Sequence, residues 1–188
     1  MRHADIPYFP PAKTRTHEVC GAGGIVFAFA LAARLAGNAL WVRETWQSSQ
    51  INPHGFSGFV APSELTVCNT KDQTESLAVA EEALRSGAVS LVVMQLSQPL
   101  GLTEGRRLQL AARDGDATGL ALIPEGMGSN AAETRWRCTP VFDQSASAQD
   151  STLQHWELIK NKSGTLGAWH VRWDAASRRI NVVSPPRQ

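Results

Sequence analysis

The sequence has few cysteines and no long hydrophobic run, and each absence excludes a class of protein. Its three cysteines, Cys20, Cys68 and Cys138, lie far apart and form no CxxC pair, and each is expected to be a small buried side chain in or beside a strand. This excludes a disulfide framework, and the spacing gives no metal-ligand pattern with the five histidines. The longest apolar run, Ile25 to Ala33, is shorter than the roughly 20 residues that cross a bilayer. Since no apolar leader follows Met1 either, we expect a cytoplasmic protein that has no contact with membranes.

The sequence also has little excess of positive over negative charge, because the formal net charge is only +1. The 188 residues are 43% hydrophobic and 19% charged, which is typical of a globular chain that forms one domain. Ten basic and thirteen acidic residues lie up to Glu133, and eight basic and four acidic residues follow it. An anionic partner is therefore expected at the C-terminal part, and an ordinary solvated surface is the alternative.

Strand and helix patterns alternate along most of the chain. The segment from Ser90 to Leu96 is apolar almost throughout, as in a central parallel strand that is buried on both faces. A helix begins at the N-cap acid Asp72 and ends at Gly87, and Thr103 is expected to cap another. Strand patterns occupy residues 16–20, 39–42, 65–68, 90–96 and 119–123, helix patterns occupy 25–35, 72–86 and 103–113, and 47–62 is a predicted loop. The order predicts an α/β fold, a doubly wound and mostly parallel sheet with helices on both faces.

The two ends of the chain follow other patterns. Residues 1–15 form a predicted extended, Pro-rich arm, and 16–188 a single domain that closes with an antiparallel β-meander at about 153–183. In the meander, Trp169 and Trp173 alternate with polar residues, which predicts that both belong to the core. In the arm, Tyr8 and Phe9 are candidate anchors for self-association or for a partner, and the alternative is an arm that lies on its own domain.

A glycine-rich turn between a strand and a helix is the context of a phosphate-binding loop. Gly21, Gly23 and Gly24 stand at this position. No Lys or Arg occurs between Arg15 and Arg34, so the turn lacks the cation that a nucleoside triphosphate requires. The strand expected to end in a magnesium-binding Asp ends instead at Gln95, which carries no charge. We interpret both as degenerate positions, and the alternative is an ATPase with residual nucleotide binding.

Other sites are sparse. The chain has no GxSxG and no HExxH motif, and we expect no catalytic residue, metal ligand or cofactor. Glu81 and Glu82 are expected on a solvated helix face, and His17, His54, His155 and His170 as isolated surface or capping residues. Basic residues interleaved with aromatics are candidates for contacts with a partner or a nucleic acid, and these are Arg135, Arg137, Lys160 and Lys162.

Several segments together resemble the ImuA family, the RecA-like accessory proteins of bacterial damage-induced mutagenesis. They span most of the chain, and no single one is diagnostic, but their order and spacing are fairly specific. The segments are Thr16-His-Glu-Val19, Leu40-Trp-Val-Arg43, Glu81 to Ala88, Leu102 to Ala112, Glu133-Thr-Arg-Trp-Arg137, Trp156-Glu-Leu-Ile-Lys-Asn-Lys162 and Gly167-Ala-Trp169.

The resemblance implies a RecA-type core and a role in the SOS response and translesion DNA synthesis. It implies an ImuB-like protein, RecA and an error-prone polymerase as partners, with at most weak or indirect DNA contact, and it offers no catalytic residue. SulA-type cell-division inhibitors, which share the degenerate RecA-like design and act on FtsZ, are the alternative. The predicted meander from Trp156 to Val183 favours the ImuA family, because the SulA chains end near the preceding strand.

Overall fold

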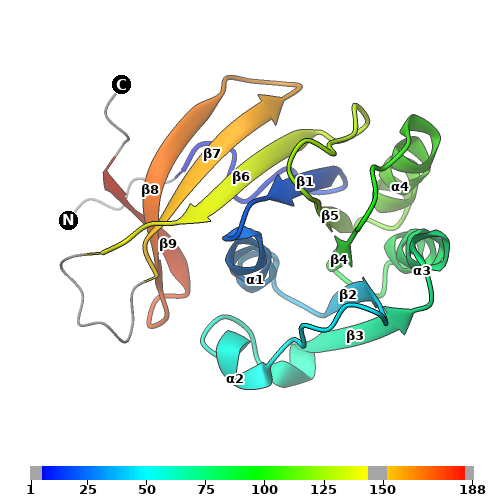
Figure 1. The fold of residues 1–188 in the computed structure, drawn as a ribbon, viewed down its shortest axis with the longest axis horizontal. Coiled ribbons are helices and arrows are strands. Elements are labelled where there is room, and N and C mark those ends of the chain that lie inside the picture. Colours follow the sequence, from blue (N-terminus) through cyan, green and yellow to red (C-terminus); the bar gives the residue numbers. More distant parts are fainter. Residues whose placement is uncertain (1–5, 144–151, 185–188) are drawn as a thin grey trace.

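The computed structural model describes residues 6–143 and 152–184 and has one nine-stranded sheet (Figure 1). The strand order is β3-β2-β4-β5-β1-β6-β7-β8-β9. The strands from β3 to β6 pair in parallel, and β6 to β9 pair in antiparallel fashion. The doubly wound parallel sheet and the C-terminal meander are thereby confirmed. The polar, Ser-rich segment between Asp143 and Thr152, where we expect a loop from its composition, lies mostly outside the described residues.

The elements follow the predicted order. The strands are β1 (Thr16–Cys20), β2 (Ala39–Glu44), β3 (Leu65–Thr70), β4 (Leu91–Gln95), β5 (Thr118–Leu122), β6 (Thr134–Pro140), β7 (Gln154–Asn161), β8 (Gly167–Asp174) and β9 (Arg179–Ser184). The helices are α1 (Gly24–Leu35), α2 (Pro53–Phe56), α3 (Gln73–Ser86) and α4 (Leu102–Asp114), and η1 (Pro62–Glu64) is a short 3₁₀ turn.

Local sequence explains the boundaries of α3. The Asp72 side chain accepts a hydrogen bond from the backbone N–H of Glu75, which satisfies one free donor of the first turn. At the other end Gly87 adopts φ +67°, a left-handed conformation that favours glycine. The prediction that Thr103 caps α4 is wrong, because Gly101 is the N-cap and Thr103 lies inside the helix.

Two hydrophobic cores lie on opposite faces of the sheet. One contains most of the buried side chains of α1 together with aromatic residues of β6, β7 and β8. The other lies between the sheet and the pair α3 and α4. Figure 1 shows the same division, with α1 beside the meander strands and α3 and α4 together on the far side of the parallel strands. Helices on both faces bury both sides of the central strands, which explains why β4 is almost uniformly apolar.

The part of the arm that the structure describes lies on its own domain. Ile6 is 4% exposed and belongs to the α1 core. The Phe9 ring contacts the rings of Phe27 and Trp156, with centroids 5.4 and 5.1 Å apart. Tyr8 stays 42% exposed, and its hydroxyl accepts a hydrogen bond from the Thr165 N–H at 3.4 Å. The arm therefore packs against α1 at Phe27.

Several local expectations need correction. The predicted loop at 47–62 contains α2, because Pro53 starts a helical turn that the Asn52 side chain caps. Trp173 is buried as expected, whereas Trp169 is only half-buried at the edge of the core. Cys68 is half-buried on the edge strand β3, unlike the buried Cys20 and Cys138. Within the described ranges, no helix is long and apolar enough to cross a membrane.

Candidate functional site

The glycine turn after β1 uses its backbone N–H groups within the protein. The N–H of Gly23 donates to the Cys138 carbonyl at 2.8 Å, and the N–H of Gly24 donates to the Gly21 carbonyl at 3.0 Å. Gly21 has φ +88°, and a Cβ there would overlap the Cys138 carbonyl oxygen. Glycine is required because strand β6 approaches so closely. Two donors that a phosphate-binding loop directs at an anion thus bind backbone oxygens instead.

A cavity of about 210 Å³ lies where the carboxyl ends of β1, β4 and β5 meet. Gly21, Gly24 and Gln95 line it together, so the structure brings both predicted degenerate positions to one site. This edge is where open α/β sheets bind their ligands. The remaining lining residues carry no charge, and they are Val19, Cys20, Ile25, Leu96, Leu122, Ile123 and Pro124.

The first turn of α1 offers no cation either. Phe27, which stands near the expected lysine position, is fully buried and contacts the rings of Phe9, Trp136 and Trp156. Gly24 and Ile25 are the residues of this turn that line the cavity, and Ile25 is 46% exposed. The Gln95 side-chain oxygen accepts a hydrogen bond from the Trp41 indole N–H at 3.4 Å. No charged side chain lines this cavity, which therefore does not suit a triphosphate with its magnesium ion.

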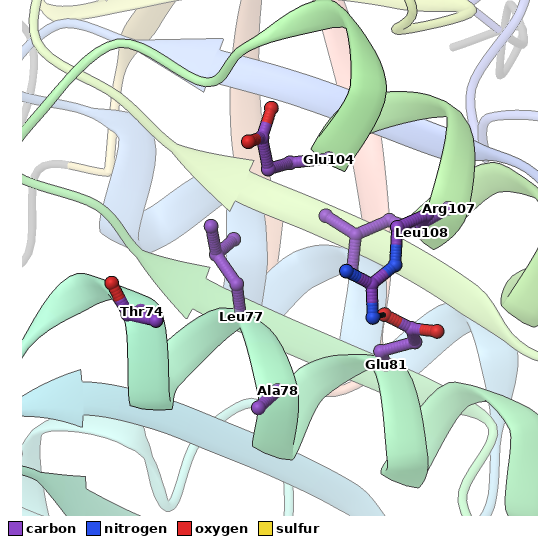
Figure 2. A pocket seen from close by; sticks show the side chains of 7 residues that line it. All are labelled: Thr74, Leu77, Ala78, Glu81, Glu104, Arg107 and Leu108. Atoms are coloured by element: carbon purple, nitrogen blue, oxygen red, sulfur yellow. Dashed lines mark ion pairs between the residues drawn. The ribbon is translucent and has the colours of Figure 1, made fainter.

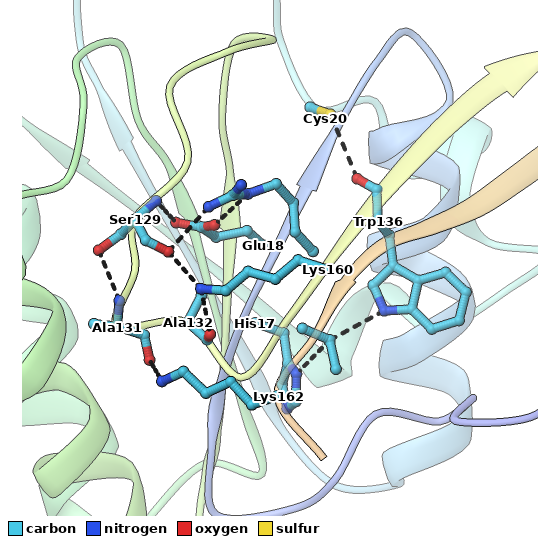
Figure 3. A network of polar contacts seen from close by, with 11 residues as sticks. His17, Glu18, Cys20, Ser129, Ala131, Ala132, Trp136, Lys160 and Lys162 are labelled. Atoms are coloured by element: carbon cyan, nitrogen blue, oxygen red, sulfur yellow. Dashed lines mark hydrogen bonds and ion pairs between the residues drawn. The ribbon is translucent and has the colours of Figure 1, made fainter. Parts of the chain in front are cut away.

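The predicted basic residues form a network with the connection between β5 and β6 (Figure 3). Glu18 in β1 is 1% exposed and accepts hydrogen bonds from Arg135 Nε and from the Ser129 N–H, both at 2.8 Å. The second Arg135 donor binds the Ser129 carbonyl at 2.9 Å. A buried carboxylate with an ion pair and a backbone donor is well satisfied. This pair fixes the connection against β1.

The two lysines, one at the end of β7 and one just after it, bind the same connection. Lys160 Nζ donates to the Ser129 and Ala132 carbonyls at 2.8 and 2.9 Å, and Lys162 Nζ donates to the Ala131 carbonyl at 2.7 Å. Burial, with the nearby charges of Arg135 and Lys162, lowers the pKa of Lys160 below its ordinary value. Both ammonium groups are thus occupied by backbone oxygens of residues 129–132, although Lys162 itself stays exposed.

The other candidate contacts are separate from this network. Arg137 is 41% exposed and pairs with Glu125 and Glu157 at 3.5 and 3.4 Å. Trp136 between the two arginines is fully buried, so its ring is not open to stacking with a base. Tyr8 and Phe9 lie with the arm on the α1 core, as described above. The structure therefore brings Arg135, Lys160 and Lys162 together and leaves the remaining candidates apart.

Glu81 was expected on a solvated helix face, but it lines a groove between α3 and α4 (Figure 2). Its side chain is only 14% exposed and bridges Arg85 and Arg107, each at 2.7 Å. The hydrogen bond from Arg85 and the charge of Arg107 lower the Glu81 pKa. Glu81 thus joins the two helices instead of lying on a solvated face, whereas Glu82 is exposed as expected.

Three of these four histidines differ from expectation, and His54 does not. His17 is fully buried, and its Nδ1 lies 2.7 Å from Thr134 Oγ1 and its Nε2 2.8 Å from the Ala12 carbonyl. His155 and His170 are opposite each other on β7 and β8, with ring centroids 5.1 Å apart. His54 is exposed in α2. In residues 6–143 and 152–184, no group of three or more His, Cys, Asp or Glu side chains could hold a metal ion.

Sequence reasoning missed two buried charged residues at the end of β2. Arg43 and Glu44 are 2% and 3% exposed. Two charged residues at the end of an apolar strand instead suggest that the chain emerges into solvent at that point. Glu44 Oε2 accepts a hydrogen bond from the exposed Trp46 indole at 2.9 Å. Arg43 donates to the carbonyls of Ser49 and Gln47. The only signal was the pair of opposite charges directly after a buried strand.

Comparison with known proteins identifies the fold and leaves the family open. No family model matches the chain, and no curated protein has a significant match to its sequence. The crystal structure of the RadB recombinase is similar, with a TM-score of 0.66 over 92% of this chain and 92% of that chain. The two chains share 13% sequence identity. The protein therefore has a RecA-like fold, and at this identity the likeness carries no residue's role across.

Proposed function

We propose that the protein is a non-catalytic adaptor of the ImuA type in the SOS response and error-prone translesion synthesis. Its partners in this proposal are an ImuB-like protein, RecA and an error-prone polymerase. The observation that carries the proposal is the state of the glycine turn. A RecA-like scaffold whose turn donates to the Cys138 carbonyl, beside a cavity without charged residues, is suited to binding and not to hydrolysis.

The extended meander supports the choice of family. Strands β7, β8 and β9 continue the sheet beyond β6, in the segment that favoured the ImuA family over the SulA inhibitors. The segment Trp156 to Lys162, which carries part of the resemblance, lies in β7 and just after it. Its lysines bind the connection between β5 and β6, so this segment supports the shape of that loop. A fixed loop surface is useful to a protein that acts through partners.

Affinity capture from the native host tests this proposal. A tagged chain is expressed from its own promoter, and its partners are identified in cells with and without DNA damage. We expect an ImuB-like protein, RecA or an error-prone polymerase among the captured proteins after damage. Each captured partner is then tested with purified proteins by size-exclusion chromatography. Capture of FtsZ without any of these would instead identify a cell-division inhibitor, and capture of none would contradict the adaptor function.

A further inference from the structure

A second cavity of about 220 Å³ adjoins the glycine-turn cavity, because Ile25 and Gln95 line both. It lies between α1, the end of β2 and the α2 region. Its volume is below the roughly 300–1,000 Å³ of pockets that hold small-molecule ligands. A space of this size suits one large side chain of another protein. Apolar side chains form most of its wall, and they are Ile25, Val26, Phe29, Trp41, Ile51 and Phe59.

One wall residue is a buried cation with incomplete partners. Arg43 lines the cavity at 2% exposure, and among the described residues its side chain donates to the Ser49 and Gln47 carbonyls alone. Its Nε is buried and has no hydrogen-bond partner within the part of the chain that the structure describes. No carboxylate of the described residues forms an ion pair with it. A guanidinium stays ionised at physiological pH, and its burial without a counter-charge is unfavourable.

The surroundings of the cavity resemble the centre of a protein interface. Ile25 is 46% exposed at its wall, and Trp46 is 66% exposed two residues beyond the end of β2. Trp and Arg are both enriched at the positions that dominate binding energy in protein interfaces. The missing component is negative charge, which an occupant can supply to Arg43.

We propose that this cavity binds a segment of a partner protein in which an aromatic or large aliphatic side chain is followed by a carboxylate. The side chain fills the apolar space, and the carboxylate pairs with Arg43. This inference rests on the proposed adaptor function and names the chemistry of one contact. The carboxylate supplies the counter-charge that Arg43 lacks among the described residues.

Peptide titration of the ¹⁵N-labelled full chain tests the proposal by NMR. The probe is acetyl-Ala-Phe-Asp-Ala-amide, and two analogues replace its Asp by Asn or its Phe by Ala. We expect saturable shifts of the backbone amides of Ile25, Arg43 and Ile51 at millimolar probe. The Asn analogue should bind about tenfold more weakly because it lacks the charge, and the Ala analogue should not saturate.

Two glycines of the same segment provide a matched pair of variants. A Cβ at Gly55 or Gly58 would meet no atom within 4 Å, and only Gly55 lines the cavity. We expect G55L to abolish probe binding and G58L to retain it, both with unchanged melting. Equal binding of the Asp and Asn peptides, binding retained in G55L, or no saturable shift would overturn the proposal. A G55L bait that still captures the SOS partners leaves the adaptor function intact and removes this cavity from it.

Discussion

His17 illustrates how single buried polar residues hold this fold. The Trp136 indole donates to Thr134 Oγ1 at 3.2 Å, the Thr134 hydroxyl donates to His17 Nδ1, and His17 Nε2–H donates to the Ala12 carbonyl. In this arrangement the imidazole is neutral, with its proton on Nε2. Burial lowers the pKa of His17 from 6.5 to about 4. The residue thus connects the arm to β6, and its burial favours the neutral form.

This arrangement predicts a pH dependence of stability. Above pH 6.5 His17 is neutral in both the folded and the unfolded chain, and its contribution is complete. Between pH 6.5 and about 4 only the unfolded chain takes up the proton, so stability falls as the pH falls, by about 3 kcal/mol in total. Urea unfolding of the wild type and H17Q at pH 7 and pH 4.5 measures this. An equal loss in both chains would show that His17 is not responsible.

The glycines of the turn should differ in their tolerance of a side chain. G21A places a Cβ against the Cys138 carbonyl at φ +88°, and we expect it to lower the free energy of unfolding by about 2 kcal/mol or more. In G24A the nearest atom is Leu122 Cδ2 at 3.5 Å, an ordinary contact, so the change should stay within about 0.5 kcal/mol. Thermal unfolding of both variants measures this difference in stability. Equal melting would mean that β6 does not approach the turn as described.

The two tryptophans of β8 differ in burial, so they should contribute unequally to the stability of the meander. Trp173 stacks on Phe59 at 4.6 Å and donates to the Gly58 carbonyl at 3.0 Å, so W173A should cost about 3–5 kcal/mol. Trp169 is half-buried and contacts Trp136 at 6.0 Å, and we expect W169A to cost about 1–2 kcal/mol. Denaturant unfolding gives both values. The reverse order would contradict this packing of β8.

The arm should behave as part of the α1 core. Removal of residues up to Ala12 takes away Ile6, Phe9 and the acceptor of His17. Burial of two such apolar side chains contributes roughly 1.5–3 kcal/mol each, so we expect a clear drop in melting temperature. Light scattering of the truncated and full chains tests the arm's predicted role in self-association. A lower mass after truncation would support that role, and unchanged melting would contradict the packing of the arm.

Sequence patterns predicted the elements whose signals are local. The apolar run of β4, the Asp72 cap and the Gly87 end of α3 are each determined by neighbouring residues. What could not be predicted depends on how separate segments of the chain pack against one another. His17 is buried because Thr134, 117 positions away, supplies a partner, and Arg43 because the chain after β2 folds back over it. The same holds for the candidate site. The glycine turn and Gln95 could be identified from local sequence, whereas the cavity beside Arg43 could not.

At the scale of the whole molecule, a RecA-like sheet carries a cavity without charged residues where such a fold would place a nucleotide. The most direct measurement is titration of the purified full chain with MgATP by calorimetry, together with an assay of phosphate release. The account predicts neither saturable binding at millimolar nucleotide nor release above background. Saturable binding with turnover that persists through purification and disappears when Gly23 is replaced by a bulkier residue would contradict the adaptor function.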